Sequence, residues 1–465
     1  MLFSSITFLY YFLPYTLLIY FLAPKNWKNV VLFIASLFFY AWGEPKYILL
    51  MLLSIFVGFI FGLLIERYYE KKQSKYLLSA SILICGGFLI YFKYADFLVM
   101  NLNLVGFNFN PVKVALPIGI SFYTFQIISY LIDVYRCEVK AQRNFLDLAA
   151  YVAMFPQLIA GPIVRYSDIE AQLAQRTHSL KNSALGIQRF TIGLTKKILL
   201  ANGLAELCSV FRATSDPSVI YYWMYAVAFT LHIYFDFSGY SYMAIGIGKI
   251  LGFHFPENFQ YTYLSTSITE FWRRCHMSLG SWFGVYVYIP LGGNRVSRGR
   301  WLFNIAIVWM LTGLWHGASW NFVLWGIGFG IILMIEKLWL LKYLKEFRLL
   351  NHLYVMFIVI LSFVLFNAAD LHEAFSDIIN MFGMCSIPLV SKEALYYLSS
   401  YSMLFLIAMI ACTPLLKNIV LHIKKSIWGV NIINIIEPFA IAVMLLIVTA
   451  YLVDGSFNPF IYFRF

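Results

Sequence analysis

The sequence predicts an all-α polytopic membrane protein. Hydrophobic residues make up 61% of the 465 residues, charged residues make up only 12%, and the mean hydropathy is +0.76. A soluble domain of this size does not need so much apolar surface. Many windows reach the roughly 20 apolar residues that span a bilayer as a helix. These runs are continuous rather than alternating, which argues against a transmembrane β-barrel.

The apolar runs predict the order of the helices. The first run is long enough to span and has no basic stretch before it, so we do not interpret it as a cleavable signal peptide. The expected helices lie at 3–22, 29–43, 46–65, 77–95, 114–134, 184–206, 218–236, 238–253, 302–316, 319–338, 352–368, 397–415 and 434–453.

Basic residues in the short loops predict the orientation. The loop after the third span carries Arg67, Lys71, Lys72 and Lys75, and such loops are cytoplasmic by the positive-inside rule. One orientation places nearly all the basic clusters on this side. We therefore expect a multi-pass protein of the cytoplasmic (inner) membrane with both termini outside. The basic residues of these cytoplasmic loops also account for the formal charge of +12, so we predict no nucleic-acid partner.

Several familiar sites are absent from the sequence. The six cysteines are scattered and form no CxxC, so we expect neither a disulfide framework nor a zinc site. The sequence also lacks the P-loop motif for nucleotide phosphates, the HExxH motif for zinc and the GxSxG nucleophile elbow. We therefore predict no metal and no bound cofactor.

Residues 144–300 form apolar but broken segments. Pro156 and Pro162 interrupt one segment, Lys196 and Lys197 lie inside another, and Asp236 lies in a third. Polar groups and irregular backbone at membrane depth persist only when they are buried in protein or line a watery cavity. We therefore expect re-entrant or short tilted helices around a cavity in this part of the chain.

His316 is the first candidate for the chemistry. It lies in an apolar stretch that has no formal charge from Trp301 to Ile335. An ionisable side chain at membrane depth is a functional candidate by default, and the alternative is a neutral ring hydrogen-bonded to a neighbouring helix. Burial keeps an imidazole neutral, and a neutral imidazole can accept a proton from a hydroxyl that attacks an ester or thioester.

The immediate neighbours of this histidine support close packing. Trp315 precedes it, and Gly313 and Gly317 form a small-xxx-small pair that lets two helices approach. Thr312 and Trp320 would share the face of the histidine if the helix continued past it.

His276 is the second candidate. It follows Cys275 in the amphipathic stretch Glu270–Leu279, and the alternative interpretation is an interfacial helix with basic residues against lipid headgroups. Adjacent helical positions point about 100° apart, so Cys275 and His276 would not face each other as a dyad.

His232 and Asp236 are spaced to share one helical face. An aspartate in a span costs on the order of 3 kcal/mol and should be paired. We expect its partner to be a histidine or an arginine, with Arg165 and Arg189 as candidates. A polar brace between helices is the alternative to a catalytic role.

A series of sequence blocks carries a family resemblance. The blocks are Leu116–Phe122, Pro156–Pro162, Tyr234–Tyr240, Phe271–Leu279, Tyr288–Asn294, Trp315–Gly317 and Pro459–Phe465. Together they make the chain similar to the membrane-bound O-acyltransferase family along essentially its whole length. Within the family it most resembles the bacterial branch that acetylates extracytoplasmic polysaccharides such as alginate and peptidoglycan.

The resemblance implies a fold and a set of site residues. It implies a single membrane domain over 1–465, a ring of transmembrane and re-entrant helices around a central funnel or tunnel. The N-terminal spans would cover 1–143, the catalytic core 144–340 and the C-terminal spans 341–465. His316 would be the catalytic histidine near the middle of the tunnel and His276 the second signature histidine. The implied supporting residues are Asp236, His232, Trp315 and Asn321, and the implied donor-binding residues are Arg273, Arg274 and Arg295.

The resemblance also implies an activity and partners. Acetyl would pass from cytoplasmic acetyl-CoA across the membrane to a cell-wall polysaccharide, with peptidoglycan favoured at the C6 hydroxyl of N-acetylmuramic acid. A periplasmic transferase of the SGNH-hydrolase type would complete the transfer. The alternatives are alginate or another exopolysaccharide as acceptor, or D-alanyl transfer to teichoic acid. A transporter, or a scaffold for the periplasmic enzyme, is the non-enzymatic alternative.

Overall fold

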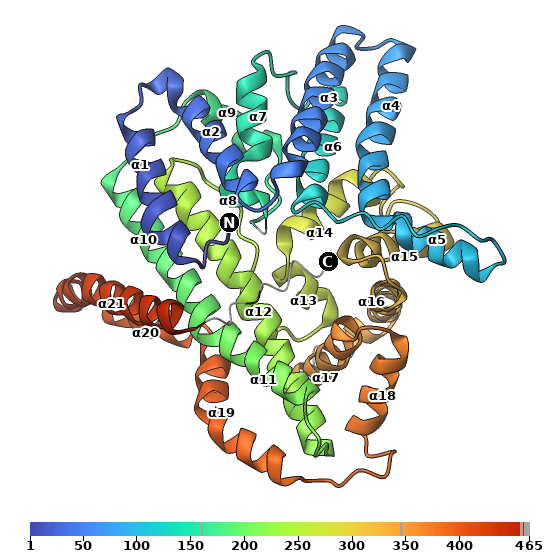
Figure 1. Ribbon diagram of the computed structural model, residues 1–465, viewed down its shortest axis with the longest axis vertical. Helices are drawn as coiled ribbons and strands as arrows, with labels where there is room; N and C mark the ends of the chain where they lie inside the picture. Colours follow the sequence, from blue (N-terminus) through green and yellow to red (C-terminus); the bar gives the residue numbers. More distant parts are fainter. Residues whose placement is uncertain (160, 345–346, 456–458, 460–465) are drawn as a thin grey trace. The chain divides into compact units, whose positions relative to one another are not determined.

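The computed structural model describes residues 1–159, 161–344, 347–455 and 459. Within these residues every regular element is a helix (Figure 1), which confirms the predicted all-α class. In the part of the chain that the structure describes, six helical stretches are long and apolar enough to cross a membrane: Pro45–Arg67, Lys72–Leu104, Trp320–Leu338, Arg348–Asn367, Lys392–Ala411 and Ile427–Asp454. The chain divides into two compact units.

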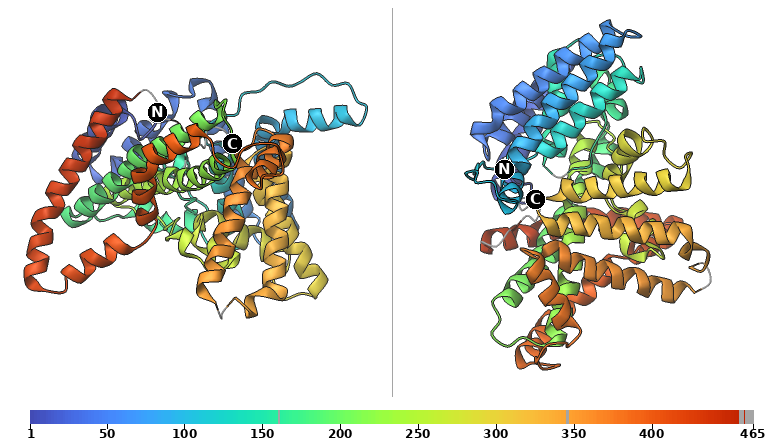
Figure 2. Two further views of the ribbon diagram at one scale, coloured as in Figure 1. Left: turned by 90° about the horizontal axis from the view of Figure 1, so that it is seen from below. Right: turned by 90° about the vertical axis from the view of Figure 1, so that its right-hand side faces the viewer.

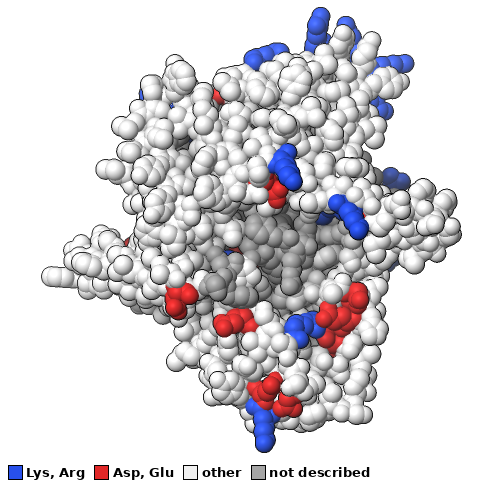
Figure 3. Space-filling model, in the orientation of Figure 1, with Lys and Arg blue, Asp and Glu red and all other residues white. Residues whose placement is uncertain are grey.

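Unit 1 comprises Met1–Phe190, Met243–Pro256 and Gly284–Tyr286. Its apolar helices α3, α4 and α6 pack side by side, and α2 packs on α7 (Figures 1 and 2). Lys and Arg side chains gather at the end of this unit where α3 turns into α4 (Figure 3). The helices are α1 (Leu13–Leu22), α2 (Lys28–Ala41), α3 (Ile48–Arg67), α4 (Lys72–Leu89), α5 (Ala95–Leu104), α6 (Ile120–Tyr135), α7 (Phe145–Ala153), α8 (Phe155–Leu158) and α9 (Tyr166–Ala174).

Unit 2 comprises Thr191–Tyr242, Glu257–Phe283 and Val287–Phe465. Helices α15, α16 and α17 lie in one row (Figure 2, right). The helices are α11 (Asn202–Arg212), α13 (Ile268–Arg274), α14 (Met277–Phe283), α15 (Arg298–His316), α16 (Trp320–Leu338), α17 (Arg348–Asn367), α18 (Leu371–Met381), α19 (Lys392–Ala411), α20 (Leu415–Ile423) and α21 (Ile427–Asp454). Helices α10 (Leu180–Thr195) and α12 (Val219–Ile250) contribute residues to both units.

One pair of predicted helices is a single helix. We expected a break between 218–236 and 238–253, but α12 runs unbroken over Val219–Ile250. Asp236 lies at this predicted break. A buried lysine neutralises that aspartate, and Gly239 lets the helix approach α10 closely, because a Cβ there would lie 2.7 Å from the Gly193 carbonyl oxygen. Both features keep the helix intact.

The broken character of the middle segment is confirmed only in its first and last parts, because the segments that contain Lys196, Lys197 and Asp236 are continuous helical runs. Short helices α7, α8, α9, α13 and α14 occur there, and a π-helix over Lys196–Ala201 joins α10 to α11. The tunnel and the three-part division at 143 and 340 stay predictions. Of the sequence blocks, Ala160 and all of the last block except Pro459 lie outside the described residues.

Candidate active site

His316 is the last residue of α15. The helix ends there because Gly317 is extended, with φ −174° and ψ 157°. Trp320 then begins α16, so the helix does not continue and the helical spacing expected between His316 and Trp320 does not apply. The resulting turn presents the half-buried imidazole at the junction of two packed helices.

The two helices of this hairpin touch backbone to backbone. A Cβ on Gly313 would lie 2.4 Å from the Phe322 carbonyl oxygen, and a Cβ on Gly326 would lie 2.4 Å from the Trp309 carbonyl oxygen. Only glycine fits at both positions, as the small-residue pattern predicted. This contact fixes the position along α16 at which α15 ends, and therefore the position of His316.

His276 lies between two short helices rather than within one. Helix α13 ends at Arg274, His276 adopts the left-handed conformation with φ 47°, and α14 begins at Met277. The stretch is therefore two short helices, and not the single helix of the alternative interpretation. Non-glycine residues in this conformation cost about 1–3 kcal/mol and cluster at functional sites. Because His276 belongs to neither helix, the helical geometry of α13 and α14 does not set the direction of its side chain.

A polar loop holds this turn. Asn258 accepts hydrogen bonds at Oδ1 from the backbone N–H (3.1 Å) and the hydroxyl (2.9 Å) of Ser278, and its carbonyl accepts from the Met277 N–H (3.0 Å). The Thr262 hydroxyl donates to the Arg274 carbonyl at 3.0 Å. These bonds bracket His276 on both sides and compensate for its strained backbone.

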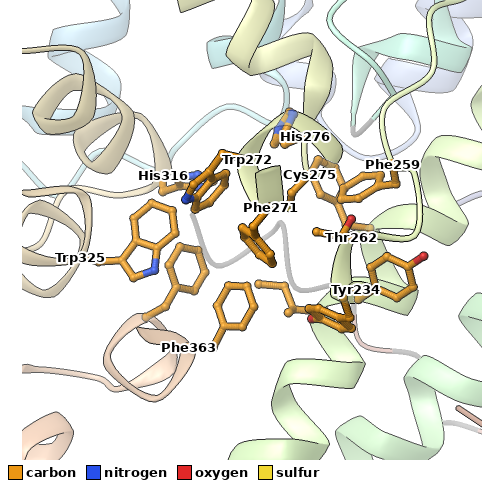
Figure 4. Close-up of a pocket in the computed structure, with 14 residues that line it drawn as sticks. Tyr234, Phe259, Thr262, Phe271, Trp272, Cys275, His276, His316, Trp325 and Phe363 are labelled. Atoms are coloured by element: carbon orange, nitrogen blue, oxygen red, sulfur yellow. The ribbon is translucent and has the colours of Figure 1, made fainter. Parts of the chain in front are cut away.

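The two histidines line one cavity of about 50 Å³ within unit 2 (Figure 4). Its wall is almost entirely apolar. Each histidine ring contacts the Trp315 indole, with ring centroids 5.6 Å apart for His276 and 5.0 Å apart for His316. The lining residues are Ile233, Tyr234, Phe237, Phe259, Thr262, Tyr263, Phe271, Trp272, Cys275, His276, His316, Trp325, Phe363 and Phe366.

His276 is only 4% exposed. Among the residues that the structure describes, neither of its ring nitrogens has a hydrogen-bond partner. Burial lowers the pKa of His276 to about 3, so the ring is neutral at physiological pH. A neutral imidazole with both nitrogens available can bind a polar group that enters the cavity.

The pKa of His276 predicts a pH-dependent stability. Below pH 6.5 the unfolded chain binds a proton that the buried ring does not, so stability should fall with falling pH. At pH 5 the loss is about 2 kcal/mol, from roughly 1.5 pH units at about 1.36 kcal/mol each. Thermal unfolding of the solubilised protein between pH 7.5 and pH 5 should show this loss, and His276→Asn, which tolerates the left-handed backbone, should remove it. An equal loss in both proteins would mean that His276 is not held neutral.

Glu336 of α16 anchors the segment that carries Trp272 and His276. Its fully buried carboxylate accepts from the backbone N–H groups of Ile268 (2.6 Å) and Thr269 (2.8 Å) in the first turn of α13. A carboxylate at a helix N-terminus compensates unpaired N–H groups and interacts favourably with the helix dipole. Ser267 also caps this helix by accepting from the Glu270 N–H. The cavity wall is therefore tied to the α15–α16 hairpin.

Asp236 pairs with Lys197 rather than with a histidine or arginine. The Lys197 Nζ lies 2.6 Å from the Asp236 Oδ1, and both side chains are fully buried. Lys197 also donates to the Pro459 carbonyl. Arg165 instead pairs with Asp168 at 2.8 Å. The geometry is that of a brace between helices, which was the alternative role considered for Asp236.

The remaining candidates lie apart from the cavity wall. The His232 Nδ1 is 2.9 Å from the Ala201 carbonyl oxygen, and the Asn321 amide donates to the Ala368 carbonyl at 2.9 Å. Arg274 pairs with Glu270 at 2.6 Å. Arg273 and Arg295 are exposed.

Cys275 lines the cavity beside His276. Burial raises the pKa of its thiol. The side chain therefore stays protonated, which disfavours a thiolate nucleophile.

Several residues that hold and line the cavity beside the two histidines were not predicted from the sequence. The Ser267-x-x-Glu270 spacing is a readable capping-box signature for the start of α13. The anchoring by Glu336 and the clamp by Asn258 depend on contacts that no local pattern reveals. Trp272 and Trp325 resemble any other aromatic residue of an apolar helix until the cavity is seen.

Comparisons with known proteins identify the family of this chain. Residues 138–369 match the family model described as MBOAT, membrane-bound O-acyltransferase family. The probable alginate O-acetylase AlgI of Azotobacter vinelandii is 43% identical over 82% of this chain and 78% of its own length. The peptidoglycan O-acetyltransferase of Helicobacter pylori is 32% identical over 100% of this chain and 98% of its own. The teichoic acid D-alanyltransferase of Streptococcus thermophilus is 29% identical over 48% and 58%, respectively. This chain therefore belongs to the membrane-bound O-acyltransferase family and is an O-acyltransferase.

Proposed function

We propose that this protein moves an acetyl group from cytoplasmic acetyl-CoA to a polysaccharide outside the membrane, with His316 as the catalytic residue. The observation that carries the proposal is the cavity shared by His316 and His276. One water occupies about 10–15 Å³ of such a volume. A cavity of about 50 Å³ therefore has room for a short acyl group, while the CoA nucleotide is far too large to enter.

The chemistry requires a proton acceptor near an acyl carbonyl. A neutral His316 takes the proton of the attacking hydroxyl, or attacks the thioester itself and carries the acetyl to the acceptor. In both routes the CoA thiolate leaves and is protonated. His276, neutral and without a partner among the described residues, can hold a polar atom of the reactants. The apolar wall excludes water, which would otherwise hydrolyse the thioester.

Exposed basic residues support binding of the donor. Arg273 and Arg295 carry guanidinium groups suited to phosphate. Arg274 would first have to release Glu270, which lies 2.6 Å away. In the orientation predicted from the basic loops these groups face the cytoplasm, where acetyl-CoA is found. The nucleotide would stay there while the acetyl group enters the cavity.

In this proposal the polysaccharide acceptor and the enzyme that completes the transfer are separate molecules. Peptidoglycan is the first candidate, because the peptidoglycan O-acetyltransferase relative matches from end to end. A secreted polysaccharide of the alginate type is the second candidate, because the alginate O-acetylase relative has the higher identity. In either case a periplasmic SGNH-type transferase would deliver the acetyl group to the glycan. Both termini would lie on that side of the inner membrane.

Ester-linked acetate in two fractions tests the acceptor. Purified peptidoglycan and secreted polysaccharide should be compared between wild-type cells and cells that lack this chain. We expect peptidoglycan acetate to be lost and to return when the wild-type chain is supplied again. Loss confined to the secreted fraction would favour the second candidate, and no change in either fraction would contradict the proposed function.

A further inference from the structure

Two tryptophan side chains that line the cavity carry buried indole N–H groups. Trp272 comes from α13 and Trp325 from α16, and both line the cavity beside His316 (Figure 4). Their rings meet edge to face at 5.5 Å, and Trp325 also meets the His316 ring at 5.1 Å. Both indole nitrogens are buried, and neither has a hydrogen-bond partner among the residues that the structure describes.

Buried indole N–H groups normally find an acceptor. Leaving one without a partner costs about 1–3 kcal/mol. A pure packing role would be met by phenylalanine, which fills much of the same space without this cost. Two such donors on adjacent walls of one cavity, next to the candidate base, therefore point to an acceptor atom that arrives with the substrate.

We propose that the Trp272 and Trp325 indole N–H groups bind the carbonyl oxygen of the acyl group and stabilise the negative charge that develops on it. This inference rests on the proposed function and adds to it the groups that stabilise the acyl carbonyl oxygen. Donors aimed at a developing oxyanion, in a site without water, act more strongly than the same donors in solution.

The step balances with the thioester and hydroxyl already named. The attacking oxygen forms a bond to the carbonyl carbon while its proton passes to His316, and the carbonyl π electrons move to the oxygen held by the two indoles. Collapse of this intermediate restores the carbonyl, breaks the carbon–sulfur bond and releases CoA thiolate. His316 returns the proton to the sulfur. If His316 carries the acyl group, the same donors serve both half-reactions.

The prediction is a selective loss of turnover. Trp272→Phe and Trp325→Phe should each lower kcat by about 10²-fold, at the low end of the loss of one oxyanion donor. The KM for acetyl-CoA should change by no more than about threefold, because the carbonyl oxygen gains charge only in the transition state. The matched control is Trp309→Phe. Trp309 packs 4.9 Å from the Trp272 ring but does not line the cavity, and its variant should keep kcat within about threefold.

The assay uses the full chain in inverted membrane vesicles, at equal protein level, with radiolabelled acetyl-CoA as donor and ester-linked acetate as product. Benzothienylalanine at position 272 or 325, which replaces the indole N–H with sulfur and keeps the ring shape, separates donation from packing. It should reproduce the loss seen with phenylalanine. Normal kcat with this analogue at both positions would overturn the inference.

Different outcomes would contradict the proposed function and the donor role of the two tryptophans. If wild-type vesicles transfer acetate and His316→Ala vesicles do not, the proposed function stands, and normal turnover in both tryptophan variants overturns only the donor role. If His316→Ala vesicles transfer acetate as the wild type does, the proposed site itself is wrong. Total transfer that falls only in proportion to the protein level, with kcat per folded protein unchanged, would show that the tryptophans serve folding alone, which also overturns the donor role.

Discussion

Replacement of His316 by alanine is expected to abolish acyl transfer while leaving the protein in the membrane. General base catalysis by one side chain contributes about 10²–10⁴-fold, and a covalent acyl carrier cannot be replaced at all. The side chain is half-buried at the end of α15, so its loss should cost little stability. Ester-linked acetate per unit of membrane protein measures the effect.

The matched control for this variant is His422→Ala. His422 is exposed on α20 and should be dispensable. Retention of acyl transfer in His316→Ala, at normal protein level, would favour the transporter or scaffold alternative over the enzyme site. Radiolabel retained on the wild-type protein and absent from His316→Ala would identify the imidazole as the acyl carrier rather than only a base.

The buried pair of Lys197 and Asp236 should give the largest effect on stability. Lys197→Met leaves the Asp236 carboxylate without the ammonium that lies 2.6 Å away in a fully buried site. Breaking one side of such a pair costs about 3–5 kcal/mol, whereas replacing both sides with apolar residues is often neutral. We therefore expect Lys197→Met to lower thermal stability and membrane level sharply, and Lys197→Met combined with Asp236→Leu to recover most of both.

A partly exposed ion pair in the same unit provides the control. Lys424 and Glu437 lie 3.3 Å apart with side chains 35% and 28% exposed, so Lys424→Met should cost less than about 1 kcal/mol. Acyl transfer in the recovered double variant then decides the role of Asp236. Transfer near the wild-type rate is expected for a brace. A stable double variant without transfer would mean that Asp236 takes part in the chemistry.

The sequence revealed the parts of the site that are local. His316 stands out because its own stretch is apolar and uncharged, and its turn follows from Gly317. The break at His276 was not predicted, because a left-handed histidine between two short helices depends on the Asn258 clamp. The pairing of Asp236 was missed for a similar reason. Lys197 lies on a separate helical segment, and only the packing of the two segments brings the charges together.

The sequence by itself determined the class of this protein, its family and its first candidate residue, because hydropathy, motif order and an ionisable group in an apolar run are properties of neighbouring residues. The tertiary structure decided which groups share a cavity. His276, Trp272, Trp325 and His316 come from separate elements, and their common site depends on the glycine contact between α15 and α16 and on the Glu336 anchor. Long-range packing of this kind leaves no periodic trace in the chain, so burial and partners had to be seen in three dimensions.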